Sequence, residues 1–201
     1  VCVCVCVCVS ASHLLCILKS IHVSGILLCG ACLDEHPLSS LGIPFGAGKE
    51  VVRPYTPVTP PGTQGHFDLI IKHYDGGQMS HHIFQMEIGD TLDCKGPFPK
   101  LPYQPNMKKR IGMLAGGTGL TPMLQVLQEI ASNPDDKTEV DFIFANRSPR
   151  DIILHEELAA MERKHPNIRV RMDGVPPSLS SFLVAVCWAG TPLLSCGSWS
   201  E

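Results

Sequence analysis

Residues 111–122 read IGMLAGGTGLTP, a short apolar run followed by a glycine-rich turn, a threonine and a proline. The apolar part, 111–115, predicts a buried strand. The glycines after it leave the loop without side-chain bulk, so its backbone N–H groups can approach a phosphate. Thr121 and Pro122 predict the start of a helix that runs to about residue 131, with the threonine as N-cap and the proline at the first helical position.

Two interpretations of this loop compete. An ordinary turn between a strand and a helix also needs glycine, and a lone Gly-x-Gly pair would favour that turn. Three glycines, two threonines and a proline between a strand and a capped helix favour a nucleotide site. The loop is not the Gly-x-Gly-x-x-Gly pattern, and it lacks the lysine of a phosphate-hydrolysing P-loop.

The chain beyond this loop keeps the same alternation. The Asn-Pro pair at 133–134 ends the first helix, and residues 140–145 predict a second apolar strand. Residues 151–164 predict a second helix with its apolar residues mostly on one face, and 168–172 predict a third strand. Strand–helix–strand–helix–strand is typical of a parallel α/β sheet.

A β-rich block precedes the loop, from about residue 51 to residue 96. In 51–57, VVRPYTP, two prolines force an extended path. Arg53 offers a charged fork for a phosphate and Tyr55 a flat face for an aromatic ring, although such a strand edge taken alone is more often structural. Strands are predicted at 66–72 and 91–95, and a short helix at 80–86.

A second glycine turn lies inside this block. Residues 76–80, GGQMS, lead from a turn to a helix start with a hydroxyl residue, and a plain turn would explain them equally well. His81 and His82 are interpreted as surface or hydrogen-bonded histidines rather than catalytic groups. A proline-rich connector at 97–105 marks a domain boundary. The basic cluster 108–110 after it is either a steering site for an acidic partner or a solvated linker face.

Composition sets the two ends apart from the middle. Of the 16 Lys and Arg and the 19 Asp and Glu residues, only Lys19 precedes residue 33 and only Glu201 follows residue 174. Seven of the ten cysteines fall within the first 32 residues, which favours a reducing, intracellular compartment over a disulfide scaffold. The net charge of −3 gives no reason to expect nucleic acid as a partner.

The N-terminal tract 1–9 alternates valine and cysteine without a break. It fits a strand of period two, and it is a poor zinc signal. A repeated GT dinucleotide would translate to the same alternation, and we favour this compositional origin. The apolar stretch 14–33 lacks an unbroken run of about 20 apolar residues, so a membrane anchor or signal segment is the minority interpretation. The tail 175–201 has no clear period.

Taken together and in this order, the three motifs resemble the NADH–cytochrome b5 reductase family, within the wider ferredoxin–NADP reductase-like flavoproteins. The resemblance looks closest to the plant and fungal type of member. It covers about residues 51–169 and is dense at 65–72 (GHFDLIIK), 95–97 (KGP), 103–109 (YQPNMKK) and 144–146 (FAN).

The resemblance implies a fold of two parts, a partial antiparallel FAD-binding β-barrel and an NAD-binding α/β domain with an incomplete C-terminus. The expected domains are an unassigned low-complexity and apolar segment, 1–40, the partial barrel, 41–105, the α/β domain, 106–174, and an unassigned tail, 175–201.

The resemblance also implies roles for residues at matching positions. Arg53 would pair with the FAD pyrophosphate and Tyr55 would lie against the isoalloxazine ring. The positions expected to hold FAD are Arg53, Pro54, Tyr55, Thr56, Ile70, Lys72, Tyr74, Gly77, Gln78, Met79 and Ser80. The positions expected to hold NADH are Gly116, Gly117, Thr118, Gly119, Thr121 and Pro122, with Thr121 near the flavin as the catalytic position.

The implied activity is hydride transfer from NADH to FAD, followed by release of single electrons to a haem protein such as cytochrome b5. No side chain needs to act as a general base, and no metal is expected. The chain carries no haem or molybdenum domain, which favours a stand-alone reductase. We expect an intracellular monomer, associated with the cytosolic face of the endoplasmic reticulum or the mitochondrial outer membrane.

Two departures from the family pattern predict a truncated or misassembled form. Only residues 41–46 match the strand region that should precede Arg53, and missing strands would expose sheet edges. The family's Cys-Gly-Pro-Pro segment has no match, because 196–199 read CGSW, and Asp173 is the candidate for the acidic residue that reads a ribose. The alternative functions are a flavin- or nucleotide-binding remnant without turnover and, from 14–33 alone, a membrane-associated interaction fragment.

Overall fold

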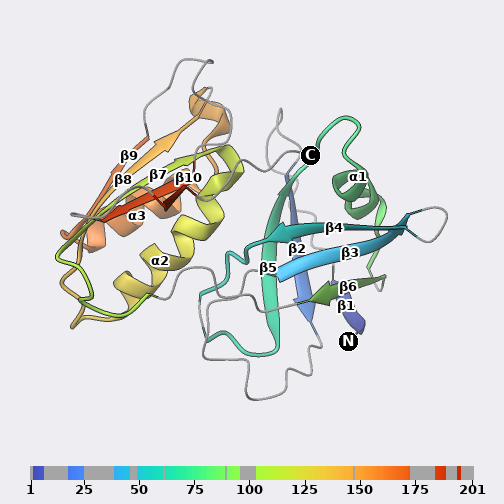
Figure 1. The fold of residues 1–201 in the computed structure, drawn as a ribbon, viewed down its shortest axis with the longest axis horizontal. Coiled ribbons are helices and arrows are strands. Elements are labelled where there is room, and N and C mark those ends of the chain that lie inside the picture. Colours follow the sequence, from blue (N-terminus) through green and yellow to red (C-terminus); the bar gives the residue numbers. More distant parts are fainter. Residues whose placement is uncertain are drawn as a thin grey trace. The chain divides into compact units, whose positions relative to one another are not determined.

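The computed structural model describes residues 2–6, 18–24, 39–45, 49–60, 62–88, 90–95, 103–146, 148–172, 184–188 and 194–195. The chain forms two compact units, Val1–Pro102 and Tyr103–Glu201 (Figure 1). Each unit is described by itself below.

The first unit is built on an antiparallel six-stranded sheet of the barrel type, with strand order β4-β3-β6-β1-β2-β5. The outer strands β4 and β5 have no ladder between them in the part of the chain that the structure describes. The backbone N–H of Val58, just past β4, donates to the carbonyl of Asp68 in β5 at 2.8 Å and links the two. The elements are β1 (Cys2–Cys6), β2 (Leu18–Ser24), β3 (Ser39–Phe45), β4 (Lys49–Tyr55), β5 (His66–Lys72), α1 (Gln78–Gln85) and β6 (Thr91–Lys95).

One apolar core joins this sheet to α1. In β5, buried Leu69 and Ile71 alternate with half-buried neighbours, as the period of two predicts for a strand with one core face. Met79 and Ile83 lie four residues apart in α1 and are both buried in the same core. Burial of such side chains contributes about 1.5–3 kcal/mol each, so packing rather than helix length stabilises this eight-residue helix.

The second unit is a five-stranded sheet of order β11-β10-β7-β8-β9. β7, β8 and β9 run parallel, as the sequence predicts, and β10 is antiparallel to both β7 and β11. The elements are β7 (Arg110–Gly116), the 3-10 turn η1 (Gly117–Gly119), α2 (Leu120–Ser132), β8 (Glu139–Ala145), the 3-10 turn η2 (Pro149–Asp151), α3 (His155–Lys164), β9 (Ile168–Arg171), β10 (Val184–Trp188) and β11 (Leu194–Ser195).

The parallel strands have one fully buried face and one more exposed face. Because β7, β8 and β9 follow one another in space and in sequence, right-handed crossovers place α2 and α3 on the same face. The residues on that face pair in register and are all buried: Ile111, Met113, Ala115, Val140, Phe142, Phe144, Ile168 and Val170.

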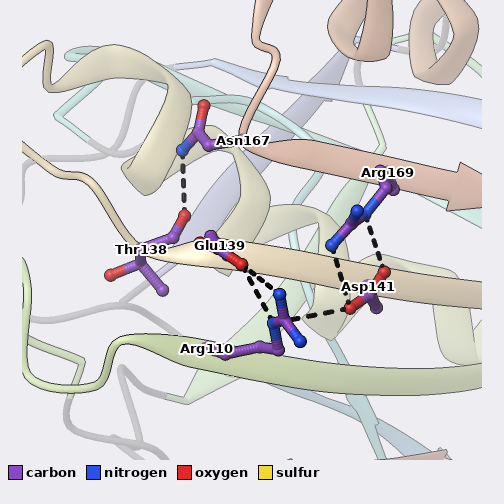
Figure 2. A network of polar contacts seen from close by, with 6 residues as sticks. All are labelled: Arg110, Thr138, Glu139, Asp141, Asn167 and Arg169. Carbon is purple, nitrogen blue, oxygen red and sulfur yellow. Dashed lines mark hydrogen bonds and ion pairs between the residues drawn. The ribbon is translucent and has the colours of Figure 1, made fainter.

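The opposite face carries a row of ion pairs (Figure 2). Arg110 on β7 binds Glu139 on β8, and its Nε lies 4.0 Å from Asp141. Asp141 in turn pairs with Arg169 on β9, at 2.9 Å from the arginine Nε. The hydrogen bond from the Arg110 guanidinium lowers the pKa of Glu139. Exposed ion pairs of this kind stabilise a fold little, so their main effect is to keep this face compatible with water.

Two predicted helix boundaries need correction. The helix expected at 151–164 begins only at His155, because Leu154 adopts the left-handed conformation at φ 55° and Pro149–Asp151 forms a separate 3-10 turn. Ser148 closes that turn, since its hydroxyl donates to the Asp151 carboxylate at 2.9 Å. In the first unit, α1 begins at Gln78, two residues earlier than predicted.

The ends of the chain contribute further strands. Cys2–Cys6 forms β1, the strand of period two that was one interpretation of the N-terminal tract, and it pairs with β2 and β6. Leu18–Ser24, inside the apolar stretch 14–33, forms β2 and pairs along its whole length with β5. Three strands therefore precede β4, rather than the single matching region at 41–46. The tail, left without an element, supplies β10 and β11.

Some features of the sequence fall outside the described residues. These are residues 96–102 of the connector, Asp173 and the segment 196–199. Within the part of the chain that is described, no helix combines the length and the apolar character needed to span a membrane.

A buried cluster of hydrogen-bonded polar side chains connects the start of the second unit to the loop between α2 and β8. The Asp136 carboxylate, 4% exposed, accepts hydrogen bonds from the Tyr103 hydroxyl, from the Thr138 hydroxyl at 2.7 Å, and from the N–H groups of Thr138 and Asn106 at 3.0 and 3.2 Å. Asn106 also accepts from the N–H of Lys137 at 2.8 Å. The segment that leads into β7 is thereby fixed before the strand begins.

This cluster makes stability depend on pH. Burial alone would raise the pKa of Asp136, but its hydrogen bonds from Tyr103, Thr138 and Asn106 outweigh burial and lower it. A lowered pKa in the folded state gives stability that is present above the unfolded value of about 3.9 and is lost as the pH falls through the folded value.

We therefore expect Asp136→Asn to reduce the free energy of unfolding by about 1–3 kcal/mol at pH 7, because charge-assisted bonds are replaced by neutral ones. The difference from the wild type should shrink below about pH 4, as measured by urea unfolding at both pH values. Asp135→Asn, at the exposed neighbour, is the control and should stay within about 0.5 kcal/mol. An equal loss at both pH values, or an equal loss in the control, would contradict the assignment.

Candidate functional site

The first set of site residues lies along the outer strand β4. Pro54 has no N–H to donate, and β4 tolerates it because the strand is at the end of the sheet. The Arg53 guanidinium is half-buried and donates to the carbonyl of Val52 at 3.0 Å. Tyr55 packs partly against the core of the first unit, and Thr56 is buried. The strand therefore presents a cation and an aromatic ring from a stiff backbone.

The second set follows the other outer strand, β5. Ile70 and Lys72 are half-buried and alternate with the core residues Leu69 and Ile71, so they lie on the opposite face of the strand. The Lys72 ammonium lies 5.5 Å from the centre of the Tyr74 ring, which is cation–π distance. The structure thus brings a second cation and a second aromatic side chain together at the end of β5.

The turn that begins α1 is closed by a serine. The Ser80 hydroxyl donates to the carbonyl of Gly77 at 3.2 Å and accepts from the N–H of Tyr74 at 3.2 Å. A Cβ added to Gly77 would lie 2.5 Å from the Ser80 oxygen and 3.1 Å from the Tyr74 Cβ, so a larger residue would require the Ser80 side chain to shift. No side chain caps α1, and its first N–H groups, at Gln78 and Met79, have no partner within the helix.

The glycine turn of the second unit has a related design. Gly117 has φ 51°, which favours glycine, and Gly117–Gly119 forms a 3-10 turn that runs directly into α2. Gly119 occupies the N-cap position and no side chain caps the helix. This corrects the expectation that Thr121 is the N-cap. The 3-10 turn moves the helix start back to Leu120, so Thr121 is already inside the helix.

Thr121 and Pro122 consequently sit at the second and third positions of α2. The Thr121 hydroxyl donates to the carbonyl of Thr118 at 3.3 Å, inside the turn, instead of capping a backbone N–H. Thr121 is buried and Pro122 is half-buried. The N–H of Leu120 donates to the carbonyls of Gly117 and Thr118, and Pro122 has no N–H, so the donors that an anion could meet here are mainly those of the turn itself. The start of α2 adds the attraction of its positive helix end.

These turns allow a test of whether a dinucleotide phosphate fits. Each offers backbone N–H groups beside a helix start that no side chain caps, and each contains a glycine, crowded by Ser80 at Gly77 and with a positive φ at Gly117. Each therefore has the donors and the absence of side-chain bulk that an approaching phosphate needs. The residues present fit one phosphate-bearing ligand in each unit.

The histidine at position 81 and the basic cluster 108–110 do not form a comparable site. The His81 ring nitrogen lies 3.0 Å from the Gln85 side-chain nitrogen one helical turn away, in keeping with a surface histidine. In the basic cluster, Arg110 is engaged by Glu139, while Lys109 is exposed. One residue was not singled out from the sequence. Asn146, at the end of β8, is 4% exposed, and its Oδ1 has no hydrogen-bond partner within the part of the chain that is described.

Comparison with known families matches the two units separately. Residues 36–103 match the family described as the oxidoreductase FAD-binding domain, and residues 113–178 match the oxidoreductase NAD-binding domain. The first range holds every site residue of β4, β5 and α1. The second begins on β7 and holds the glycine turn.

Individual relatives agree with these matches. An NADH-cytochrome b5 reductase-like protein of Arabidopsis thaliana is 50% identical over 150 residues, which are 75% of this chain and 44% of the relative. NADH-cytochrome b5 reductase 1 of Dictyostelium discoideum is 50% identical over 139 residues, or 65% of this chain and 49% of the relative. The chain therefore spans about half the length of these curated relatives.

A solved structure is similar over most of both chains. The cytochrome b5 reductase domain of Ulva prolifera nitrate reductase aligns with a TM-score of 0.71 and 30% identity. The alignment covers 88% of this chain and 74% of that domain.

The tight contact at Gly77 yields a mutational test. Gly77→Ala should destabilise the first unit by about 1–3 kcal/mol, because the new methyl group would overlap the Ser80 oxygen. Ser80→Ala removes that oxygen. The loss of unfolding free energy in the double variant should therefore be smaller than the sum of the losses in the two single variants. Urea unfolding of the two single variants and the double variant measures this coupling, and strict additivity would show that overlap with the Ser80 oxygen is not the cause.

Proposed function

Because the chain belongs to the NADH–cytochrome b5 reductase family of flavoproteins, we propose that it passes electrons from NADH through FAD to a haem protein such as cytochrome b5. The observation that carries this proposal is the pair of uncapped helix starts, one in each unit, each entered through a glycine. They lie within the FAD-binding match and the NAD-binding match respectively.

In this proposal the first unit holds FAD. The N–H groups at the start of α1 donate to its pyrophosphate, next to Gly77, Gln78, Met79 and Ser80. Arg53 and Lys72 supply the positive charge that balances two phosphates. Tyr55 and Tyr74 present flat rings to the aromatic parts of the cofactor, while Pro54, Thr56 and Ile70 shape the surface around them.

The chain's contribution is to bind and orient the cofactor. When bound, FAD supplies the chemistry that joins a two-electron hydride donor to a one-electron acceptor. The stiff Pro54 backbone fixes where the Arg53 and Tyr55 side chains begin, and a fixed ring position is what hydride transfer over a short distance requires.

The second unit holds NADH in this proposal. Gly116, Gly117, Thr118 and Gly119 bring their backbone N–H groups close to the pyrophosphate, and the start of α2 adds the positive end of its dipole. The Thr121 hydroxyl donates to Thr118, which leaves the lone pairs of its oxygen able to accept a hydrogen bond from a ligand. We assign Thr121 the position beside the reacting ring, with Pro122 packing near the nicotinamide.

We further propose that the protein works as a monomer inside the cell. We propose that it is associated with the cytosolic face of the endoplasmic reticulum or of the mitochondrial outer membrane. The cysteine distribution and the names of the relatives support the intracellular part. Fractionation of cells that express the full chain tests the membrane placement.

The activity is tested on the purified full chain. We expect a yellow protein with about one FAD per chain, whose absorbance near 450 nm bleaches when NADH is added without oxygen. Added cytochrome b5 should then be reduced in proportion to the NADH consumed. A yellow protein that NADH does not bleach would identify a flavin-binding remnant without turnover, and a colourless protein that takes up no FAD would overturn the proposal.

Arg53 provides a more specific test of FAD binding. Arg53→Leu should weaken FAD retention about 10- to 100-fold, the amount expected for one lost charge-assisted hydrogen bond of about 1.5–3 kcal/mol. Flavin fluorescence released on dilution measures this. Arg150→Leu, at an exposed arginine of the second unit, is the matched control and should retain FAD like the wild type. Equal retention by both variants would remove Arg53 from the site.

A further inference from the structure

Asn146 combines deep burial with an unmet hydrogen-bond acceptor. Its side-chain nitrogen donates to the carbonyl of Phe144 at 3.3 Å, but its Oδ1 has no partner among the described residues. An unpaired buried acceptor destabilises the ligand-free fold. Such groups are rare, so this one calls for a partner that binds later.

Strand geometry defines where this oxygen lies. Asn146 continues the row of Phe142 and Phe144 two residues further along, so its side chain is on the face covered by α2 and α3. It also stands at the carboxyl end of β8. The preceding residue, Ala145, pairs with Gly116, the last residue of β7 before the glycine turn. Asn146 is therefore one strand away from the start of α2.

The location identifies the kind of group that the oxygen meets. Ligands of open α/β sheets bind outside the carboxyl ends of the strands. A pyrophosphate at the glycine turn can only accept hydrogen bonds, so it cannot satisfy another acceptor. Neighbouring strands are about 4.8 Å apart, so Asn146 is about that far to the side of the glycine turn. Along a dinucleotide, the ribose hydroxyls are the first hydrogen-bond donors next to the pyrophosphate, and they come before the adenine and the nicotinamide rings.

We propose that Asn146 is a nucleotide-binding residue, whose side-chain oxygen accepts a hydrogen bond from a ribose hydroxyl of NADH held at the glycine turn. The inference rests on the proposed function, since it presupposes a dinucleotide at the start of α2. It assigns Asn146 to binding rather than to the stability of the ligand-free fold.

That distinction is measurable in the full chain with NAD⁺ as the probe. Asn146→Leu keeps a similar volume and removes the oxygen. The dissociation constant for NAD⁺, measured by calorimetry, should rise about three- to tenfold, the effect of one net hydrogen bond. The melting temperature without nucleotide should be unchanged or higher, because the variant no longer buries an unpaired acceptor.

A matched control lies at the other edge of the same sheet. Asn167, just before β9, donates from its side chain to the carbonyl of Thr138 at 2.9 Å. Asn167→Leu should lower the melting temperature and leave NAD⁺ affinity unchanged. ADP-ribose, which keeps both riboses and lacks the nicotinamide ring, should lose the same factor in affinity as NAD⁺ on Asn146→Leu.

The outcomes separate the two proposals. A wild-type chain that binds no NAD⁺ overturns the proposed NADH site itself. A wild type that binds, with Asn146→Leu binding equally well, overturns only the role of Asn146. A loss seen with NAD⁺ but not with ADP-ribose overturns the ribose as the donor. If leucine does not fit, Asn146→Ala removes the same oxygen without added bulk, and its affinities for the two ligands decide.

Discussion

A helix can offer its first N–H groups to an anion only if no side chain caps them and the chain enters without a Cβ in the way. No side chain caps either helix, and glycine leads into both, at Gly77 before α1 and at Gly117–Gly119 before α2. In the second unit the N–H of Leu120 is used by the 3-10 turn, so the turn itself supplies the donors. Leaving a helix start uncapped forgoes about 1 kcal/mol, and glycine adds an entropic cost. The fold offsets both through buried side chains of the same helices, such as Ile83 in α1 and Leu124 and Leu127 in α2.

The second unit shows how a sheet turns this local feature into a site. Parallel pairing of β7, β8 and β9 brings their carboxyl ends to one edge, and the register is continuous from Arg110↔Glu139 to Gly116↔Ala145. A slip by one residue would turn the buried side chains to the opposite face. The Phe142 and Phe144 rings, stacked 5.8 Å apart, fill the interior up to that edge. At the opposite edge, Asp136 ties the segment entering β7 to the segment entering β8. The strands that lead to the glycine turn are thus fixed by the packing of Phe142 and Phe144 and by the hydrogen bonds of the buried Asp136 carboxylate.

The sequence predicted those parts of the fold that depend on local pattern. Residues 66–72 and 91–95 coincide with β5 and β6, and the strand–helix alternation after residue 110 gave a parallel sheet. For β1 the alternation of valine and cysteine fitted a strand but could not decide for one, and β2 had no pattern of its own. Both strands depend on partners far along the chain, such as Cys4↔Thr91 and Leu18↔Lys72. The start of α3 was predicted too early for another reason. Leu154 adopts the left-handed conformation, and an apolar residue in that conformation has no sequence signal of its own. The unmet acceptor of Asn146 is likewise a property of its surroundings rather than of the residue type.

The hydroxyl groups at the two turns have a shared role that their residue types do not reveal. Ser80 and Thr121 each donate the hydroxyl proton to a carbonyl three residues earlier, at Gly77 and Thr118 respectively, so toward a ligand each can act as an acceptor. Each hydroxyl therefore ties the turn closed, and the donors left for a phosphate are backbone N–H groups. Backbone N–H groups recognise a phosphate without regard to what it is attached to. Discrimination between FAD and other phosphate ligands must then come from side chains outside the turn, for which Arg53, Tyr55 and Lys72 on the two outer strands are the candidates.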